Sequence, residues 1–122
     1  MRAGIGPGSS EWTANWMGQA PVTIFIFNPE SKAAWLPPAV PQDPMHVVDT
    51  QSIGAAIQNM LLAAQDMGIG SLWICDVFFA YQDLSDWLGE TSEMIAAVSF
   101  GVPDENPDAR PRKSIEEVTR WI

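Results

Sequence analysis

The chain has 122 residues, with 15 acidic and 6 basic side chains, a formal net charge of -9 and 47% apolar residues. This length suits one domain, and the apolar content excludes an acidic disordered chain. The negative charge argues against binding to nucleic acids and anionic membranes, because both present phosphate groups. Apolar runs are too short to span a bilayer, and residues 1–8 lack the apolar core of a secretory signal. We therefore expect a soluble, cytoplasmic protein with a single domain over residues 1–122.

Metal and thiol chemistry find little support in the sequence. Cys75 is the only cysteine and His46 the only histidine, which excludes an intrachain disulfide and a zinc site built on several thiolates. His46 lies in a proline-rich segment, and no carboxylates share a helical face with it at ligand spacing, so we expect no metal site. Cys75 ends a short apolar run, where a cysteine is typically a small buried residue.

The first half of the chain predicts one strand and a long loop. Residues 1–19 carry no clear period, so we expect an irregular segment there. The run 20–27 is β-branched and aromatic, which is typical of a buried strand, and Asn28 with Pro29 ends it. Residues 31–48 contain four prolines, which favour an extended loop. A long loop inside a compact domain often takes part in function, so this loop is expected to border the substrate-side opening of a site.

The second half predicts helices that alternate with strands. Apolar residues recur at helical spacing after Asp49 or Thr50, and Gly68 suits the end of that helix. The remaining elements are expected at 71–75 (strand), 81–88 (helix, closed by Gly89), 94–100 (strand) and from Ser114 (short helix with a capping box to Glu117). This order predicts an α+β fold with a mixed sheet flanked by helices.

The basic residues gather at the C-terminal end. No lysine or arginine occurs between residues 33 and 109, whereas four of the six basic residues fall in the last thirteen positions: Arg110, Arg112, Lys113 and Arg120. Such a cluster on an acidic chain suggests local binding of a small anion. An alternative interpretation is that the cluster only offsets nearby carboxylates such as Asp104 and Asp108.

The helix expected at about 50–67 predicts a subunit contact. Its apolar surface is wider than a core of this size covers, and Gly54, Ala55 and Ala63 allow close approach. Apolar surface of this kind is typically buried against another subunit, so we expect a homodimer.

Five segments, in this order, resemble the nitroreductase family of FMN-dependent oxidoreductases. They are Ala-Pro-Val at 20–22, Ala-Ile-Gln-Asn-Met-Leu-Leu-Ala-Ala at 56–64, Met-Gly-Ile-Gly-Ser-Leu-Trp-Ile at 67–74, Ala-Ala-Val-Ser-Phe-Gly-Val-Pro at 96–103 and Arg-Pro-Arg-Lys-Ser-Ile-Glu-Glu-Val at 110–118. The resemblance implies a nitroreductase-like sheet flanked by helices. The N-terminal Arg-x-Ser-x-Arg phosphate motif of the family has no match here, so the resemblance implies an N-terminally truncated member.

The resemblance also implies where the isoalloxazine ring of FMN lies. Trp73 and Ile74 are expected to pack on the ring, and the backbone N–H of Cys75 or Asp76 is expected to approach its N5. An Asp76 carboxylate that points towards the ring would lower the reduction potential of the flavin.

The phosphate of FMN is expected to be held by Arg110 and Arg112, which match the family's C-terminal basic pair. Trp35, in the proline-rich loop, is expected either to stack on a planar acceptor or to cap the core. The implied reaction passes two electrons from NAD(P)H through FMN to a nitroaromatic, quinone or similar acceptor, and the flavin carries the chemistry. The alternatives are a truncated, non-catalytic flavin-holding or dimerisation module and an unrelated anion-binding domain.

Overall fold

The computed structural model describes residues 7–32 and 44–122. The elements, in chain order, are α1 (Pro7–Gln19), β1 (Val22–Lys32), α2 (Pro44–Asp66), β2 (Gly70–Ile74), the 3-10 helix η1 (Asp76–Ala80), α3 (Tyr81–Leu88), β3 (Ser92–Gly101) and α4 (Ile115–Val118). The three strands form one sheet in the order β1-β3-β2, and both pairings are antiparallel. The α+β class is confirmed. The expectation of a mixed sheet is wrong for the described strands, because neither pairing is parallel.

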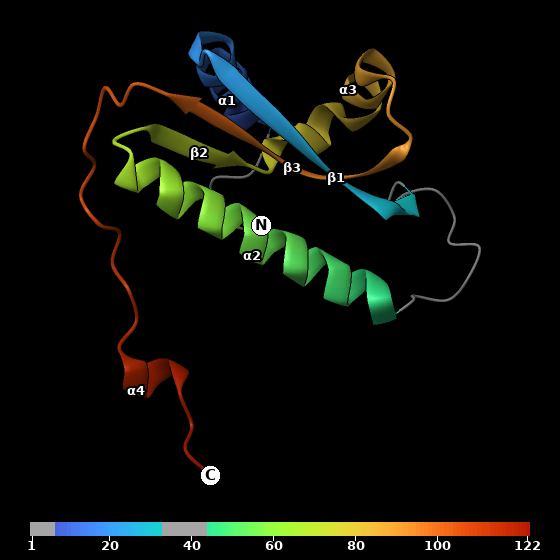
Figure 1. The fold of residues 1–122 in the computed structure, drawn as a ribbon. Coiled ribbons are helices and arrows are strands. Elements are labelled where there is room, and N and C mark those ends of the chain that lie inside the picture. The colour runs from blue at the N-terminus through green and yellow to red at the C-terminus, as the bar shows by residue number, and fades with distance from the viewer. Residues whose placement is uncertain (1–6, 33–43) are drawn as a thin grey trace.

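Helices cover both faces of the sheet (Figure 1). On one face, Ile57 of α2 packs against Ala96 and Val98 of β3. On the other face, β3 packs with residues of η1 and α3, and α1 reaches this cluster through Met17. The central strand is therefore the most deeply buried element: Met94, Ala96, Ala97 and Val98 are each 0% exposed.

The first half of the chain departs from its predictions. Residues 7–19 form helix α1, so the expectation of an irregular segment over 1–19 is wrong there. β1 continues through Pro29 to Lys32, with an irregular register beyond Asn28. A proline is tolerated there because β1 is an edge strand and its pairing is already interrupted.

Helix α2 begins at Pro44, earlier than predicted. Proline is accepted in the first turn of a helix, because the N–H that it lacks would have no intrahelical partner there. His46 therefore lies on a helix and not in a loop. Trp35 and most of the predicted proline-rich loop lie outside the described residues.

Helix ends in the second half follow their local signals. Gly68 has φ +71 and Gly89 has φ +67, the left-handed conformation that suits glycine after a helix. The predicted capping box is present: the Glu117 N–H donates to Ser114 Oγ at 3.3 Å, and the Ser114 N–H donates to Glu117 Oε2 at 2.9 Å.

Tyr81 links α3 to the central strand. Its ring is 5% exposed, its hydroxyl accepts from the Met94 N–H at 2.8 Å, and it donates to the Ser92 carbonyl at 3.4 Å. We expect Tyr81→Phe to lower the free energy of unfolding by about 1–2 kcal/mol, because the buried Met94 N–H loses its acceptor. Urea denaturation measures the change. The ring is retained, so its stacking on Phe78 is kept, and an unchanged free energy of unfolding would contradict the assigned role of the hydroxyl.

Candidate functional site

The residues expected along the flavin ring form the end of β2 and the start of η1. Their side chains alternate between the two faces of the sheet. Trp73 packs with the cluster under α2, whereas Ile74 is 2% exposed and packs in the opposite cluster with Val77 and Met94. The Ile74 side chain is thus part of the core within one chain, and of this pair only Trp73 is partly exposed.

Trp73 lies against the middle of α2. A Cβ built on Gly54 would lie 3.8 Å from the outer ring carbon of Trp73, so Gly54 faces the sheet. Ala55 and Ala63, in contrast, are exposed. Of the three small residues expected at a subunit contact, two therefore remain available on the surface of α2.

Cys75 is exposed at the turn between β2 and η1, so the expectation of a buried cysteine is wrong. The reason is that β2 ends at Ile74, one residue earlier than expected. Although the residue is exposed, partial desolvation of its sulfur raises the pKa of the Cys75 thiol, and the neighbouring Asp76 carboxylate raises that pKa further. The thiol is therefore protonated at neutral pH and is a weak nucleophile.

Asp76 has a defined partner in α1. The hydroxyl of Thr13, which is 7% exposed, donates to Asp76 Oδ2 at 2.8 Å. The carboxylate is thus held towards α1. The sequence did not indicate Thr13, because the helix that carries it was not predicted.

Arg110 and Arg112 are exposed on the segment that follows β3. Arg112 Nη1 donates to the carbonyl oxygen of Arg110 at 3.3 Å. The ion pair found among the described residues joins His46 to Glu93, so neither guanidinium has a carboxylate partner in that part of the chain. Two unpaired guanidinium groups two residues apart are a suitable donor set for a phosphate group.

Within one chain, the structure does not bring this basic pair to the Trp73–Asp76 turn. Figure 1 shows the segment after β3 running away from the sheet towards α4, whereas the turn lies at the opposite end of β2. The ring-contacting and phosphate-binding residues implied by the resemblance are therefore separated in the single chain.

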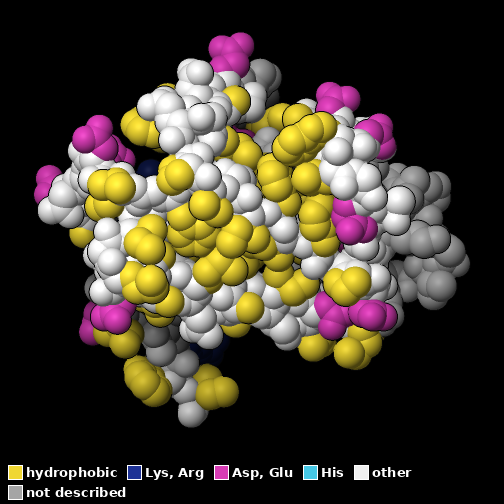
Figure 2. Space-filling view, turned by 45° about the horizontal axis from the view of Figure 1, so that its top comes forward, with side chains coloured by type: hydrophobic (Ala, Val, Ile, Leu, Met, Phe, Trp, Pro, Cys, Tyr) yellow, Lys and Arg dark blue, Asp and Glu magenta, His cyan; other side chains and the backbone are white. Residues whose placement is uncertain are grey.

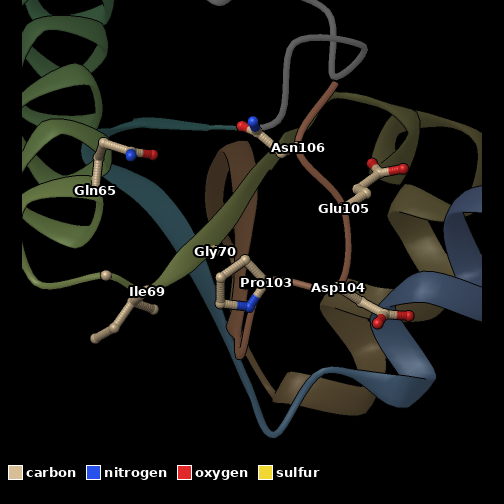
Figure 3. Close-up of a pocket in the computed structure, with 8 residues that line it drawn as sticks. Gln65, Ile69, Gly70, Pro103, Asp104, Glu105 and Asn106 are labelled. Atoms are coloured by element: carbon tan, nitrogen blue, oxygen red, sulfur yellow. The ribbon is translucent and has the colours of Figure 1, made fainter. Parts of the chain in front are cut away.

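A cavity of about 430 Å³ lies where the chain leaves the sheet. Figure 3 shows Pro103 beside Gly70, with Asp104 and Glu105 continuing the chain away from it. Its lining consists of Gln65, Gly68, Ile69, Gly70, Pro103, Asp104, Glu105 and Asn106. This lining contains two carboxylates and no basic side chain, so the cavity does not suit a phosphate group.

Over residues 7–32 and 44–122, no three histidine, cysteine or carboxylate side chains come close enough to hold a metal ion. The helices of the same ranges include none with the length and apolarity of a membrane span.

Comparison with known proteins places the chain in a family. The model of the nitroreductase family matches residues 6–102, most of the sequence, so the chain belongs to the nitroreductase family. The sequence is 36% identical, over 61 residues, to the NADPH-flavin oxidoreductase of Vibrio harveyi. The fold is similar to that of a nitroreductase-type protein of Desulfovibrio desulfuricans crystallised in complex with FMN, with a TM-score of 0.65 and 28% identity.

The chain matches only part of each relative. The match covers 48% of this chain and 25% of the Vibrio harveyi protein. The structural match covers 82% of this chain and 54% of the Desulfovibrio desulfuricans protein. The chain thus spans about a quarter and about half of these two proteins.

Proposed function

We propose that this protein is an FMN-dependent oxidoreductase that takes two electrons from NAD(P)H and passes them to a nitroaromatic, a quinone or a similar planar acceptor. Membership of the nitroreductase family supports the reaction class, and one of its relatives was crystallised with FMN. One observation carries the cofactor assignment. Neither Arg110 nor Arg112 has a carboxylate partner in the described part of the chain, so both guanidinium groups suit a phosphate.

The residues of the chain have distinct roles in this proposal. Arg110 and Arg112 bind the phosphate, and Trp73 packs against the flavin ring. The backbone N–H of Cys75 or Asp76, the two residues that follow the last paired residue of β2, donates towards the ring. Backbone donors lose no side-chain entropy on binding, and bound FMN supplies the redox chemistry. A side-chain acid, base or nucleophile is not required.

The test is flavin binding followed by turnover. Purified protein is mixed with FMN, the bound fraction is measured from the flavin spectrum after gel filtration, and NADPH and NADH oxidation is followed with a quinone and with a nitroaromatic acceptor. Bound FMN with acceptor-dependent oxidation supports the proposal. Bound FMN without oxidation supports the flavin-holding module instead. Absence of binding at tens of micromolar FMN contradicts the cofactor assignment.

We further propose a homodimer in which one chain supplies the basic pair to the other chain's Trp73–Asp76 turn, because a single chain keeps them apart. Exposed hydrophobic side chains are numerous on the described part of the single chain, and Figure 2 shows one face on which they gather. On α2, the residues at spacings of seven that face away from the sheet are apolar and exposed: Val48 (48%), Ala55 and Leu62 (59%). This stripe suits a second copy of the same helix.

We expect Leu62→Glu to weaken dimerisation about 100-fold, because a carboxylate would be buried in the subunit contact without a partner. Sedimentation velocity over a concentration series measures the dissociation constant. Gln65→Glu, which adds the same charge on the flank of α2, is the matched control and is expected to remain dimeric. A wild-type protein that is monomeric at micromolar concentration contradicts the dimer.

A further inference from the structure

We propose that Thr13 is a positioning residue, whose hydroxyl holds the Asp76 carboxylate against α1 and thereby sets the electrostatic potential at the turn after β2. The bond is short, 2.8 Å from Thr13 Oγ1 to Asp76 Oδ2, and it joins residues 63 positions apart. It is therefore a tertiary contact that exists only when α1 is packed on the domain.

The position of the hydroxyl is fixed by packing. Thr13 is 7% exposed. Met17, one helical turn further along α1, packs against the core cluster that contains Ile74 and Val77. These two contacts hold α1 against Asp76 and against the core cluster that the turn joins. A hydrogen bond to an ionised acceptor is stronger than one between neutral groups, so the carboxylate has a clear preference for this side.

The charge of Asp76 acts across the turn. Partial desolvation is the largest cause that raises the pKa of the Cys75 thiol, the Asp76 carboxylate is the second, and the nearby Trp73 side chain opposes both. Loss of the Thr13 donor would leave the carboxylate less compensated and make the potential at Cys75 more negative. Where FMN is bound, which rests on the proposed function, the same change would disfavour the uptake of electrons by the flavin.

Cys75 is a built-in reporter of this potential, because it is the only cysteine of the chain and is exposed. Only its thiolate reacts with iodoacetamide, so the rate of alkylation at pH 7 follows the thiolate fraction. We expect Thr13→Val to slow alkylation about threefold and Asp76→Asn to accelerate it about threefold. Thr13→Ser keeps the hydroxyl and should restore the wild-type rate.

A double variant separates positioning from general damage. Thr13→Val should have no further effect on the alkylation rate when Asp76→Asn is already present, because the charge that it positions is gone. Partial unfolding would expose Cys75 more fully and accelerate alkylation, the opposite of the expected effect. Melting temperatures are measured for every variant, so that all rates are compared on folded protein.

The flavin measurement distinguishes this inference from the proposed function. In FMN-loaded protein, we expect the reduction potential to fall in Thr13→Val, to rise in Asp76→Asn and to return to the wild-type value in Thr13→Ser. A wild-type protein that binds no FMN overturns the proposed function, while the alkylation rates still support the positioning role of Thr13. An unchanged alkylation rate in Thr13→Val, or an unchanged potential in variants that bind FMN, overturns the inference.

Discussion

Replacing Arg110 or Arg112 by alanine is expected to weaken FMN binding roughly ten- to a hundredfold. A hydrogen bond to a charged group contributes about 1.5–3 kcal/mol, and about 1.4 kcal/mol corresponds to a factor of ten in affinity. Neither guanidinium is engaged by a carboxylate in the described part of the chain, so no competing ion pair has to break when a phosphate binds. Fluorescence titration of FMN with wild type and both variants measures the loss.

Two controls isolate the phosphate contact. Riboflavin has no phosphate, so it should bind weakly and equally to all three proteins. Arg120→Ala removes the same charge beyond α4, outside the basic pair, and should leave FMN affinity close to that of the wild type. FMN binding should also weaken as salt rises, since the contact is ionic and exposed. Equal FMN affinity in the wild type, Arg110→Ala and Arg112→Ala would remove the pair from the site.

Helix ends in the second half could be predicted because their signals are local. Gly89 closes α3 in a left-handed conformation, and Ser114 caps α4 through the predicted exchange with Glu117. In both cases the residues that end or begin the helix are within four positions of each other. Such geometry depends little on the rest of the fold.

The features that escaped prediction depend on tertiary contacts. Helix α1 has no clear apolar period, and Thr13 and Met17 gain their role only by packing on η1 and the core. The four prolines of residues 31–48 predict a loop that includes Pro44, although a proline at the first position of a helix is favourable. The distance of the Arg110–Arg112 pair from the turn after β2 has no signature in the sequence, because it depends on the path of the whole segment after β3.

His46 and Glu93 form a contact that the sequence did not indicate. His46 Nε2 lies 2.7 Å from Glu93 Oε2, and the side chains are 42% and 7% exposed. Glu93 is on the central strand opposite Asn28, and His46 is in the first turn of α2. The pair therefore attaches the start of α2 to the sheet. Among the described residues, His46 is the side-chain partner of the nearly buried Glu93 carboxylate.

We expect His46→Ala to lower the free energy of unfolding by about 2–3 kcal/mol. His46 is hydrogen-bonded to a carboxylate whose side chain is only 7% exposed, and losing a hydrogen bond to a charged group typically costs about 1.5–3 kcal/mol. His46→Gln, whose amide can still donate to the carboxylate, should recover part of the loss. In a Glu93→Gln background, His46→Ala should have little effect, since the buried charge is absent. Urea denaturation of the wild type, His46→Ala, Glu93→Gln and the double variant gives the double-mutant cycle. A loss from His46→Ala that is the same with Glu93 and with Gln at position 93 would show that His46 stabilises α2 by packing and not through the carboxylate.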